Sequence, residues 1–338
     1  MKHVRRILAI DGGGIKGVIP AAFLSTIESA TGKRILDHFD LIAGTSTGGI
    51  IALGLGLGLS ADDILRFYEA DGPRIFAQEE TKWFGLKKPI GFLKEKARGG
   101  RQFLLPKYNA NALRASLKRV FGDQKLGASQ TRLLIPAFDR QRREIHVFKT
   151  AHHPRFGIDW KERVVDVALA TAAAPTYLPD HQLDSGVSLL DGGIWANNPA
   201  GIAVVEAIGT LGWSNDDLYV LSIGCSEEPV SIPQKSGYLG LALKMADIFM
   251  LGQSRGAHGT AKLLTGHTER DPRVFRFQPI MSKGEFCLDG VRKIKALKGV
   301  GANMAREAIP QISDFFLNGS REGFVPYHSY EQEEPFQK

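Results

Sequence analysis

The stretch Gly44-Thr45-Ser46-Thr47-Gly48 lies between two apolar runs, residues 39–43 and residues 49–53. This order predicts a buried strand, a sharp turn and a helix. The glycines two positions before and after Ser46 allow a turn that is too tight for residues with a Cβ atom. A turn of this kind lifts the serine hydroxyl out of the sheet at the amino end of the next helix. The stretch therefore predicts a serine nucleophile and, with it, a serine hydrolase.

A second glycine-rich stretch, Asp11-Gly12-Gly13-Gly14-Ile15-Lys16-Gly17, follows a predicted strand at residues 5–10 and precedes a predicted helix at residues 18–30. Successive glycines can direct their N–H groups the same way, and the helix adds its positive end. Each such donor stabilises the negative oxygen of an ester under attack by about 2.7–4 kcal/mol. We therefore expect Gly12, Gly13 and Gly14 to form an oxyanion hole, with Lys16 or a neighbour adding positive charge.

The candidate base is Asp191, which ends a predicted strand at residues 187–190 and precedes Gly192 and Gly193. A serine hydroxyl is a weak nucleophile until a base accepts its proton. A carboxylate in contact with Ser46 could take that proton directly if burial raises its basicity. A turn or helix-capping aspartate is the alternative interpretation of Asp-Gly-Gly taken alone.

A Ser-His-Asp triad is the second interpretation, because a histidine is the usual base in α/β-hydrolases. The histidines that follow Asp191 in the chain are His258, His267 and His328. The first two lie in or near a helical pattern and the third lies in a polar tail, so none follows a strand end. Surface or helix-packing roles are favoured for all nine histidines of the chain.

A Rossmann-type nucleotide-binding protein is the third interpretation, since Gly12, Gly14 and Gly17 match G-x-G-x-x-G after a strand. That fingerprint needs an acidic residue at the end of the second strand. Here the second strand ends in the serine turn, and Asp11 would repel a pyrophosphate. This pattern therefore favours a dinucleotide site less than an oxyanion hole.

Strands and helices alternate along the chain, which predicts a three-layer α/β fold with a mainly parallel central sheet and helices on both faces. We expect one domain at residues 1–323, with the motifs in residues 5–210 and a polar tail at residues 324–338. Residues 226–255, a loop leading into an apolar helix expected over residues 239–264, are a second candidate for a regulatory region, and a core helix is the favoured interpretation.

Residues 71–107 form the one long stretch without a clear period, and such segments are often functional. From residue 81 onward, lysines and arginines alternate with tryptophan and phenylalanine. That mixture suits lipid headgroups and equally suits a nucleotide. The segment is predicted to be a lid or regulatory element, and a solvated basic loop is the alternative.

The composition sets limits on the class of protein. The 338 residues carry a formal charge of +7, which favours an anionic partner without choosing among phospholipid, nucleotide and nucleic acid. Cys225 and Cys287 give no disulfide framework or zinc spacing, so we expect no metal site. The longest apolar stretch, residues 50–59, is too short to span a bilayer, which takes about 20 residues. A cytoplasmic protein without a signal peptide is expected.

The three motifs, in this order, resemble those of the patatin-like phospholipases. The resemblance covers about the first 210 residues and extends to Ala172-Ala173-Ala174-Pro175-Thr176-Tyr177. It implies cleavage of glycerophospholipid acyl esters by Ser46 and Asp191, without histidine, calcium or another cofactor. It also implies an oxyanion hole at Gly12, Gly13 and Gly14. The motifs are completed by Asp11, Lys16, Gly17, Gly44, Gly48, Gly192 and Gly193.

Within that family, the compact length and residues 44–60 resemble bacterial phospholipase effectors that cyclic GMP–AMP activates in anti-phage defence. The resemblance implies a cyclic dinucleotide activator and membrane phospholipids as substrates. It implies a cytoplasmic enzyme that is peripheral to the inner membrane when active and binds no nucleic-acid polymer. Homo-oligomer formation stays open, as do an unregulated lipase, a nucleotide-dependent oxidoreductase and a membrane-binding module without activity.

Overall fold

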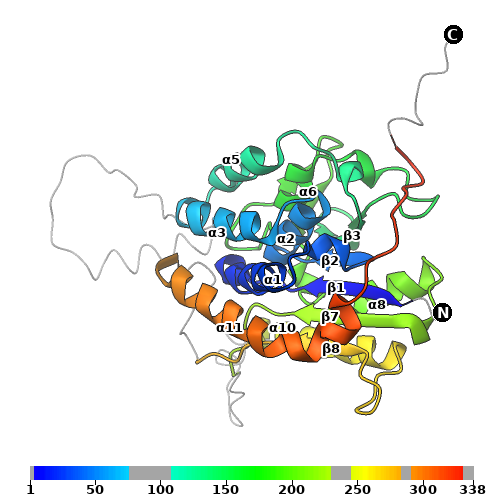
Figure 1. Ribbon diagram of the computed structural model, residues 1–338. Helices are drawn as coiled ribbons and strands as arrows, with labels where there is room; N and C mark the ends of the chain where they lie inside the picture. The colour runs from blue at the N-terminus through cyan, green and yellow to red at the C-terminus, as the bar shows by residue number, and fades with distance from the viewer. Residues whose placement is uncertain (1–3, 76–107, 230–244, 283–290, 330–338) are drawn as a thin grey trace, which may run out of the picture.

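The computed structural model describes residues 4–75, 108–229, 245–282 and 291–329 (Figure 1). Most of the predicted lid, residues 71–107, therefore lies outside the described residues. Its first five residues complete the helix α3 (Ala61–Ile75). Residues 330–338 of the predicted polar tail also lie outside. Residues 324–329 are fastened to the domain, since the Tyr327 N–H donates to the Ala151 carbonyl at 2.7 Å.

The central sheet has eight strands, and five of them run parallel. The parallel strands follow the order β3 (Arg132–Asp139), β2 (Leu41–Gly44), β1 (Arg5–Ile10), β7 (Leu218–Ile223) and β8 (Val274–Phe277). At the β3 side, β4 (Glu144–Lys149) and β6 (Ser188–Asp191) pair antiparallel with β3, and β5 (His181–Gln182) pairs antiparallel with β6. The predicted mainly parallel α/β sheet is confirmed.

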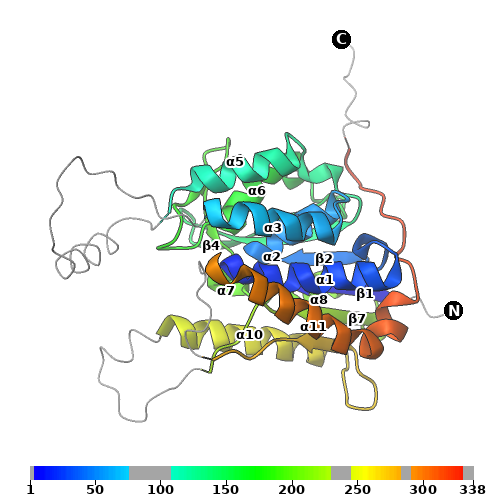
Figure 2. The same ribbon diagram turned by 60° about the vertical axis from the view of Figure 1, so that its left-hand side comes forward.

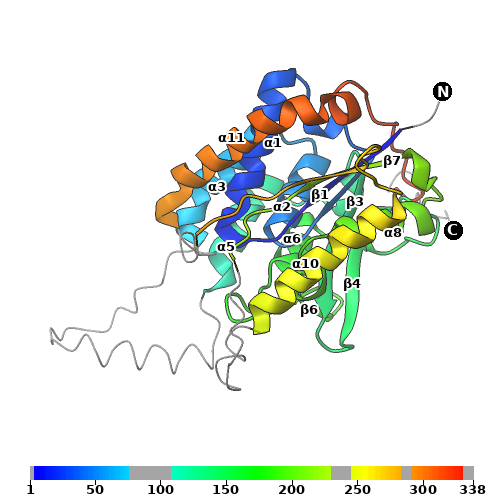
Figure 3. The ribbon, with the colours of Figure 1, turned by 90° about the horizontal axis from the view of Figure 1, so that it is seen from below.

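Helices cover both faces because the central strands are apolar on both faces (Figure 3). Along β1, Leu8 and Ile10 point into one hydrophobic core, while Ile7 and Ala9 point into the other. The first core lies under α1 (Val18–Thr31), α2 (Thr47–Gly56), α3, α5 (Ala110–Phe121), α6 (Val164–Thr171) and α11 (Ile294–Ile312). The second lies under α8 (Ala200–Gly209) and α10 (Met245–Leu264).

The prediction that α10 is a core helix is wrong. The helix lies at the lower edge of the molecule in Figure 2, outside α8. Among its described side chains, only that of Ala261 is buried, and Phe249 is 64% exposed. Close packing against α8 instead uses backbone, because a Cβ atom at Gly201 would lie 3.0 Å from the Ala257 carbonyl oxygen. The apolar composition of the α10 sequence does not distinguish a helix that packs on the surface from one that is buried in the core.

The strand register brings the ends of β2 and β6 together. Leu134 of β3 pairs with both Ala43 of β2 and Lys149 of β4, so β2 and β4 lie on opposite edges of β3. Ala137 pairs with β4 and with Asp191 of β6, which places β6 on the same edge as β2. Because β6 runs antiparallel to β3 and β2 runs parallel to it, their carboxyl ends face one another. Ser46 lies two residues beyond the end of β2, and Asp191 is the last residue of β6.

Candidate active site

Ser46 occupies a strained turn between β2 and α2. Its backbone angles are φ 55° and ψ −121°, a combination that residues with a Cβ atom rarely adopt. Such strain persists only where the surroundings hold it. Here the Ser46 N–H donates to the hydroxyl of Thr171 at 3.0 Å, and that hydroxyl donates to the Pro136 carbonyl at 2.6 Å. The predicted strand, sharp turn and helix are present.

The glycines flanking this turn are required by space. A Cβ atom at Gly44 would lie 2.1 Å from the carbonyl oxygen of Gly48. At Gly48 it would lie 2.2 Å from the carbonyl oxygen of Ile10, so α2 approaches β1 backbone to backbone. The turn can therefore present Ser46 at the carboxyl edge of the sheet only with glycine at both positions.

Asp191 is buried at the end of β6, with the Ser46 hydroxyl near enough to act on the pKa of its carboxyl. The Gly193 N–H donates a hydrogen bond to this carboxylate, 2.6 Å from Oδ1. Burial raises the pKa of Asp191 to about 6, and the Gly193 N–H and the Ser46 hydroxyl oppose the rise only in part. Gly192 lets the strand end close to β3, since a Cβ atom there would lie 2.3 Å from the Pro136 carbonyl oxygen. The carboxylate can thus accept a proton near neutral pH.

The glycine-rich loop after β1 presents two amides. The Gly12 N–H donates to the Asn197 carbonyl at 3.0 Å, so it is already engaged. Gly14 has φ 58° and begins the 3₁₀ turn η1 (Gly14–Gly17), where the first N–H groups have no partner within the helix. Among the described residues, none accepts a hydrogen bond from the Gly13 or Gly14 N–H. Of the three glycines expected to form an oxyanion hole, Gly13 and Gly14 are thus the two whose N–H groups could donate to a substrate oxygen.

Lys16 points away from this loop toward the segment that follows β7. Its Nζ atom donates to the Ser226 hydroxyl at 2.9 Å and lies 3.4 Å from Oε1 of Glu228. A Cβ atom at Gly17 would meet the Thr47 hydroxyl at 2.1 Å, so this glycine lets η1 pack on the serine turn. The two motif positions therefore have anchoring and packing contacts.

The three histidines of the triad interpretation lie elsewhere. Burial and surrounding cations lower the pKa of His258, on α10, to about 4. The Nδ1 atom of His267 accepts from the Arg273 and Val274 N–H groups, each at 3.0 Å, and His328 hydrogen-bonds to the Pro154 carbonyl. Within the described part of the chain, none of the three hydrogen-bonds to Ser46 or Asp191. The geometry therefore favours Asp191 as the base.

Residues 8–204 match the family model described as patatin-like phospholipase, which is more than half of the 338 residues. The chain belongs to the patatin-like phospholipase family. The predicted family is thereby confirmed.

Its curated relatives include bacterial and plant patatin-like proteins. The chain is 37% identical over 219 residues to a "cGAMP-activated phospholipase" of Pseudomonas aeruginosa, covering 64% of this chain and 61% of the relative. It is 32% identical over 260 residues to a protein of the same name from Vibrio cholerae, covering 71% of each. The match to "Patatin-like protein 2" of Arabidopsis thaliana is 35% identical over 237 residues, covering 63% of this chain and 55% of that protein. For the first and third, the chain spans less than two thirds of the relative.

Two residues of this patatin-like site were not predicted from the sequence. Asn197 joins the two loops, because its Oδ1 atom would lie 2.4 Å from a Cβ atom at Gly12 and 3.2 Å from one at Gly193. Arg276 binds the carboxylate of Asp11 from β8. The pair Asn197-Asn198, so soon after Asp-Gly-Gly, could have indicated the first; no local pattern indicates the second.

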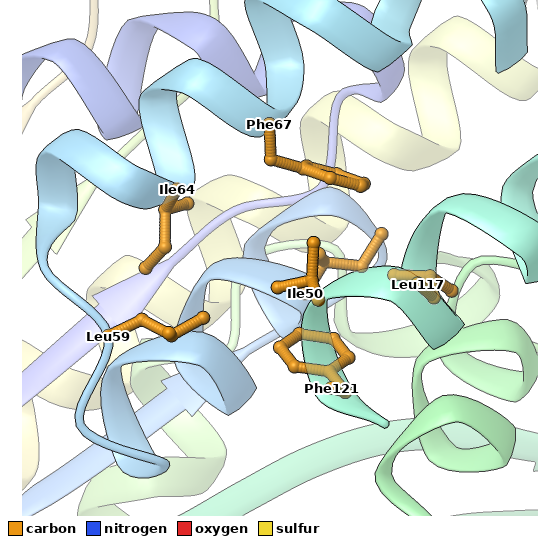
Figure 4. Close-up of a pocket in the computed structure, with 7 residues that line it drawn as sticks. Ile50, Leu59, Ile64, Phe67, Leu117 and Phe121 are labelled. Atoms are coloured by element: carbon orange, nitrogen blue, oxygen red, sulfur yellow. The ribbon is translucent and has the colours of Figure 1, made fainter. Parts of the chain in front are cut away.

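An apolar cavity lies between α2, α3 and α5 of this patatin-like chain (Figure 4). Ile50, Phe67 and Phe121 point into it, and Ile50 is one helical turn beyond Ser46. Its volume of about 10 Å³ is enough for one water molecule and far too small for an acyl chain.

The described residues contain neither a metal-binding cluster nor a membrane-spanning helix. Within residues 4–75, 108–229, 245–282 and 291–329, no cluster of three histidine, cysteine or acidic side chains could hold a metal ion. In these same ranges, no helix combines the length and apolar character that a membrane span requires. Cys225 is buried as a free thiol, and Cys287 lies outside the described residues.

The raised pKa of Asp191 predicts a pH dependence. Asp191 accepts a proton only when ionised, so labelling of Ser46 by a fluorophosphonate probe should slow as the pH falls through about 6. Below that pH, the rate should fall about tenfold per unit. Labelling rates measured between pH 4.5 and pH 8 test this, with Asp191→Asn as the control that should show no such step. A wild-type midpoint below pH 5 would contradict the assignment.

Proposed function

We propose that this protein is a serine acyl hydrolase that cleaves the acyl esters of glycerophospholipids through Ser46 and Asp191. The observation that carries the proposal is the strained Ser46 beside a buried carboxylate, that of Asp191, whose pKa is raised to about 6. The Gly13 and Gly14 amides beside it suit a developing negative oxygen. Membership of the patatin-like phospholipase family supports the same substrate class.

The reaction runs in two halves. The Ser46 oxygen attacks the ester carbonyl carbon while its proton passes to Asp191, and the carbonyl oxygen becomes negative beside the Gly13 and Gly14 N–H groups. When the tetrahedral intermediate collapses, the lysophospholipid oxygen leaves with the proton from Asp191. Water then attacks the acyl-serine while Asp191 accepts its proton. The Ser46 oxygen leaves, recovers that proton, and the fatty acid is released.

A cyclic dinucleotide is the proposed activator. Relatives from Pseudomonas aeruginosa, Vibrio cholerae and Escherichia coli carry the name "cGAMP-activated phospholipase" at 32–37% identity. The formal charge of +7 suits both an anionic nucleotide and an anionic lipid surface. In this proposal, the activated enzyme hydrolyses membrane phospholipids at the inner membrane during phage infection.

The proposal is tested with the purified full chain and two substrates. Fatty-acid release from phosphatidylethanolamine–phosphatidylglycerol vesicles is measured with cyclic GMP–AMP, with cyclic di-AMP and without nucleotide, beside hydrolysis of a soluble short-chain ester. Release from vesicles should rise at least about tenfold with cyclic GMP–AMP, which corresponds to about 1.4 kcal/mol of coupling. Absence of hydrolysis of either substrate under all conditions would refute the acyl hydrolase. Full release without nucleotide and no response to it would refute only the activation.

A further inference from the structure

Arg276 contacts Asp11, at the start of the glycine-rich loop, across the intervening strand β7. It lies on β8, outside the residues 8–204 that match the family model, and β7 separates β8 from β1. Arg276 stands beside Ser222 in the strand register, and its Nη1 atom donates to the Ser222 hydroxyl at 2.7 Å. The small side chain of Ser222 thus lets the guanidinium cross over β7 to Asp11.

The contact with Asp11 is a bidentate ion pair, in which the carboxylate of Asp11 is buried and the side chain of Arg276 is 14% exposed. Nη1 of Arg276 lies 2.7 Å from Oδ1 of Asp11, and Nη2 lies 2.5 Å from Oδ2. Nη2 also donates to Oε1 of Gln278 at 2.6 Å, which fixes the plane of the guanidinium. Bidentate pairs of this kind are strong and directional. Burial raises the pKa of the Asp11 carboxyl, and the charge of Arg276 opposes that rise.

Asp11 is held at its backbone as well as at its side chain. Its N–H donates to the Ile223 carbonyl at 3.0 Å, and its carbonyl accepts from the Cys225 thiol at 3.4 Å. Two residues later, a Cβ atom at Gly13 would lie 2.4 Å from Cβ of Cys225, so the loop packs directly on the segment that follows β7. Asp11 is therefore the fixed point from which the Gly13 and Gly14 amides extend.

The donors themselves have no side chain that could orient them. Glycine populates many backbone conformations at similar energy, so neighbouring anchors decide where the Gly13 and Gly14 N–H groups point. Lys16 anchors the loop on one side through Ser226. On the other side, the anchor is Asp11, and Arg276 is the side chain that binds its carboxylate.

We propose that Arg276 is a positioning residue for the oxyanion hole, acting through Asp11 on the Gly13 and Gly14 amides. The inference rests on the proposed hydrolase, because it gives those amides a role in the reaction. Arg276 does not touch the reacting atoms, so its loss should lower kcat and leave KM little changed. Removing one oxyanion donor outright costs about 10²–10³ in kcat, so misplacing the loop should cost about 10–100-fold.

The test compares Arg276→Gln with Arg273→Gln. Arg273 is the control, because its side chain is similarly shielded, 11% exposed against 14% for Arg276, and binds Asp271 through two atoms, at 2.9 Å and 2.6 Å. It lies just before the amino end of β8. Arg276→Gln should lower kcat for the soluble ester and the fluorophosphonate labelling rate about 10–100-fold. Arg273→Gln should change both less than about twofold at a comparable loss of thermal stability.

Two further variants keep the result interpretable. Arg276→Lys retains the charge but not the fork, so it should fold and should recover only part of the lost rate. The double variant Asp11→Asn/Arg276→Gln should be no slower than Arg276→Gln, because both changes act through one contact. A double variant that is slower by the product of the two single effects would overturn the proposal.

Amide hydrogen exchange of residues 11–17 provides a readout that does not depend on activity. Exchange there should accelerate in Arg276→Gln and stay unchanged in Arg273→Gln. The positioning role is overturned if Arg276→Gln matches Arg273→Gln in kcat, or if exchange at residues 11–17 does not change. A wild-type protein that hydrolyses no ester would refute the proposed hydrolase, and the exchange comparison would still decide whether Arg276 holds the loop.

Discussion

Ser46→Ala is expected to lower fatty-acid release and fluorophosphonate labelling by roughly 10⁴-fold or more, because the reaction loses its nucleophile. Neighbouring hydroxyls cannot replace it. The Thr45 hydroxyl donates to the Ala196 carbonyl at 2.6 Å, and the Thr47 hydroxyl is paired with Tyr68. Both are buried away from the position that Ser46 occupies. The variant should be assayed with the soluble ester and with vesicles, so that a defect in chemistry is not mistaken for one in membrane contact.

The controls for this variant concern folding. Ser46→Ala should unfold at nearly the wild-type temperature, because alanine is strained as serine is at φ 55°. Ser46→Gly should be equally inactive yet about 1 kcal/mol more stable than Ser46→Ala, since glycine tolerates that conformation. Ser129→Ala changes a buried serine at the other end of the sheet, before β3, and should keep full activity. Retention of more than about 1% of wild-type activity by Ser46→Ala would exclude Ser46 as the nucleophile.

Asp191→Asn is expected to lower kcat by about 10²–10⁴-fold and to stabilise the fold at neutral pH. The rate falls because an amide cannot accept the serine proton. The stability rises because the pKa of Asp191 is about 6 in the folded protein, above its ordinary value of 3.8. Folding therefore favours the protonated form, and above pH 6 the wild type keeps an ionised carboxylate in a buried site. The gain at pH 7 should be on the order of 2–3 kcal/mol.

The stability that Asp191→Asn gains over the wild type should depend on pH. The wild-type penalty is absent below about pH 3.8, grows as the pH rises, and is complete above about pH 6. Urea unfolding at pH 7 and at pH 4 should thus show an Asp191→Asn advantage that nearly disappears at the lower pH. Asp166→Asn is the opposite control, because hydrogen bonds from His181 and Arg163 hold the pKa of Asp166 at about 2. That variant should be less stable than wild type at pH 7. A destabilised Asp191→Asn protein at pH 7 would contradict the argument.

The parts of this site that depend on neighbouring residues could be predicted from the sequence. Glycines around Ser46 and after β1 predict turns, because close backbone contacts and positive φ require glycine at particular positions. The alternation of strands and helices predicts the parallel sheet. The direction of β6 could not be predicted, because an apolar run of four residues has the same pattern in a parallel and in an antiparallel strand. Asn197 engages the Gly12 amide and Arg276 binds Asp11 across 265 positions, contacts that only the folded chain creates. The surface position of α10 was missed for the same reason.

The shared edge of β3 has a consequence for how this enzyme class can diversify. Between the pairing of Leu134 with β2 and of Ala137 with β6, only Ile135 and Pro136 remain, and a proline fits there because that edge needs no amide donor. The distance between the Ser46 turn and Asp191 is thus set by the number of residues of β3 that lie between its pairings with β2 and with β6. A one-residue insertion between Leu134 and Ala137 should therefore move Asp191 away from Ser46, whereas an insertion in a connecting segment should leave their separation unchanged.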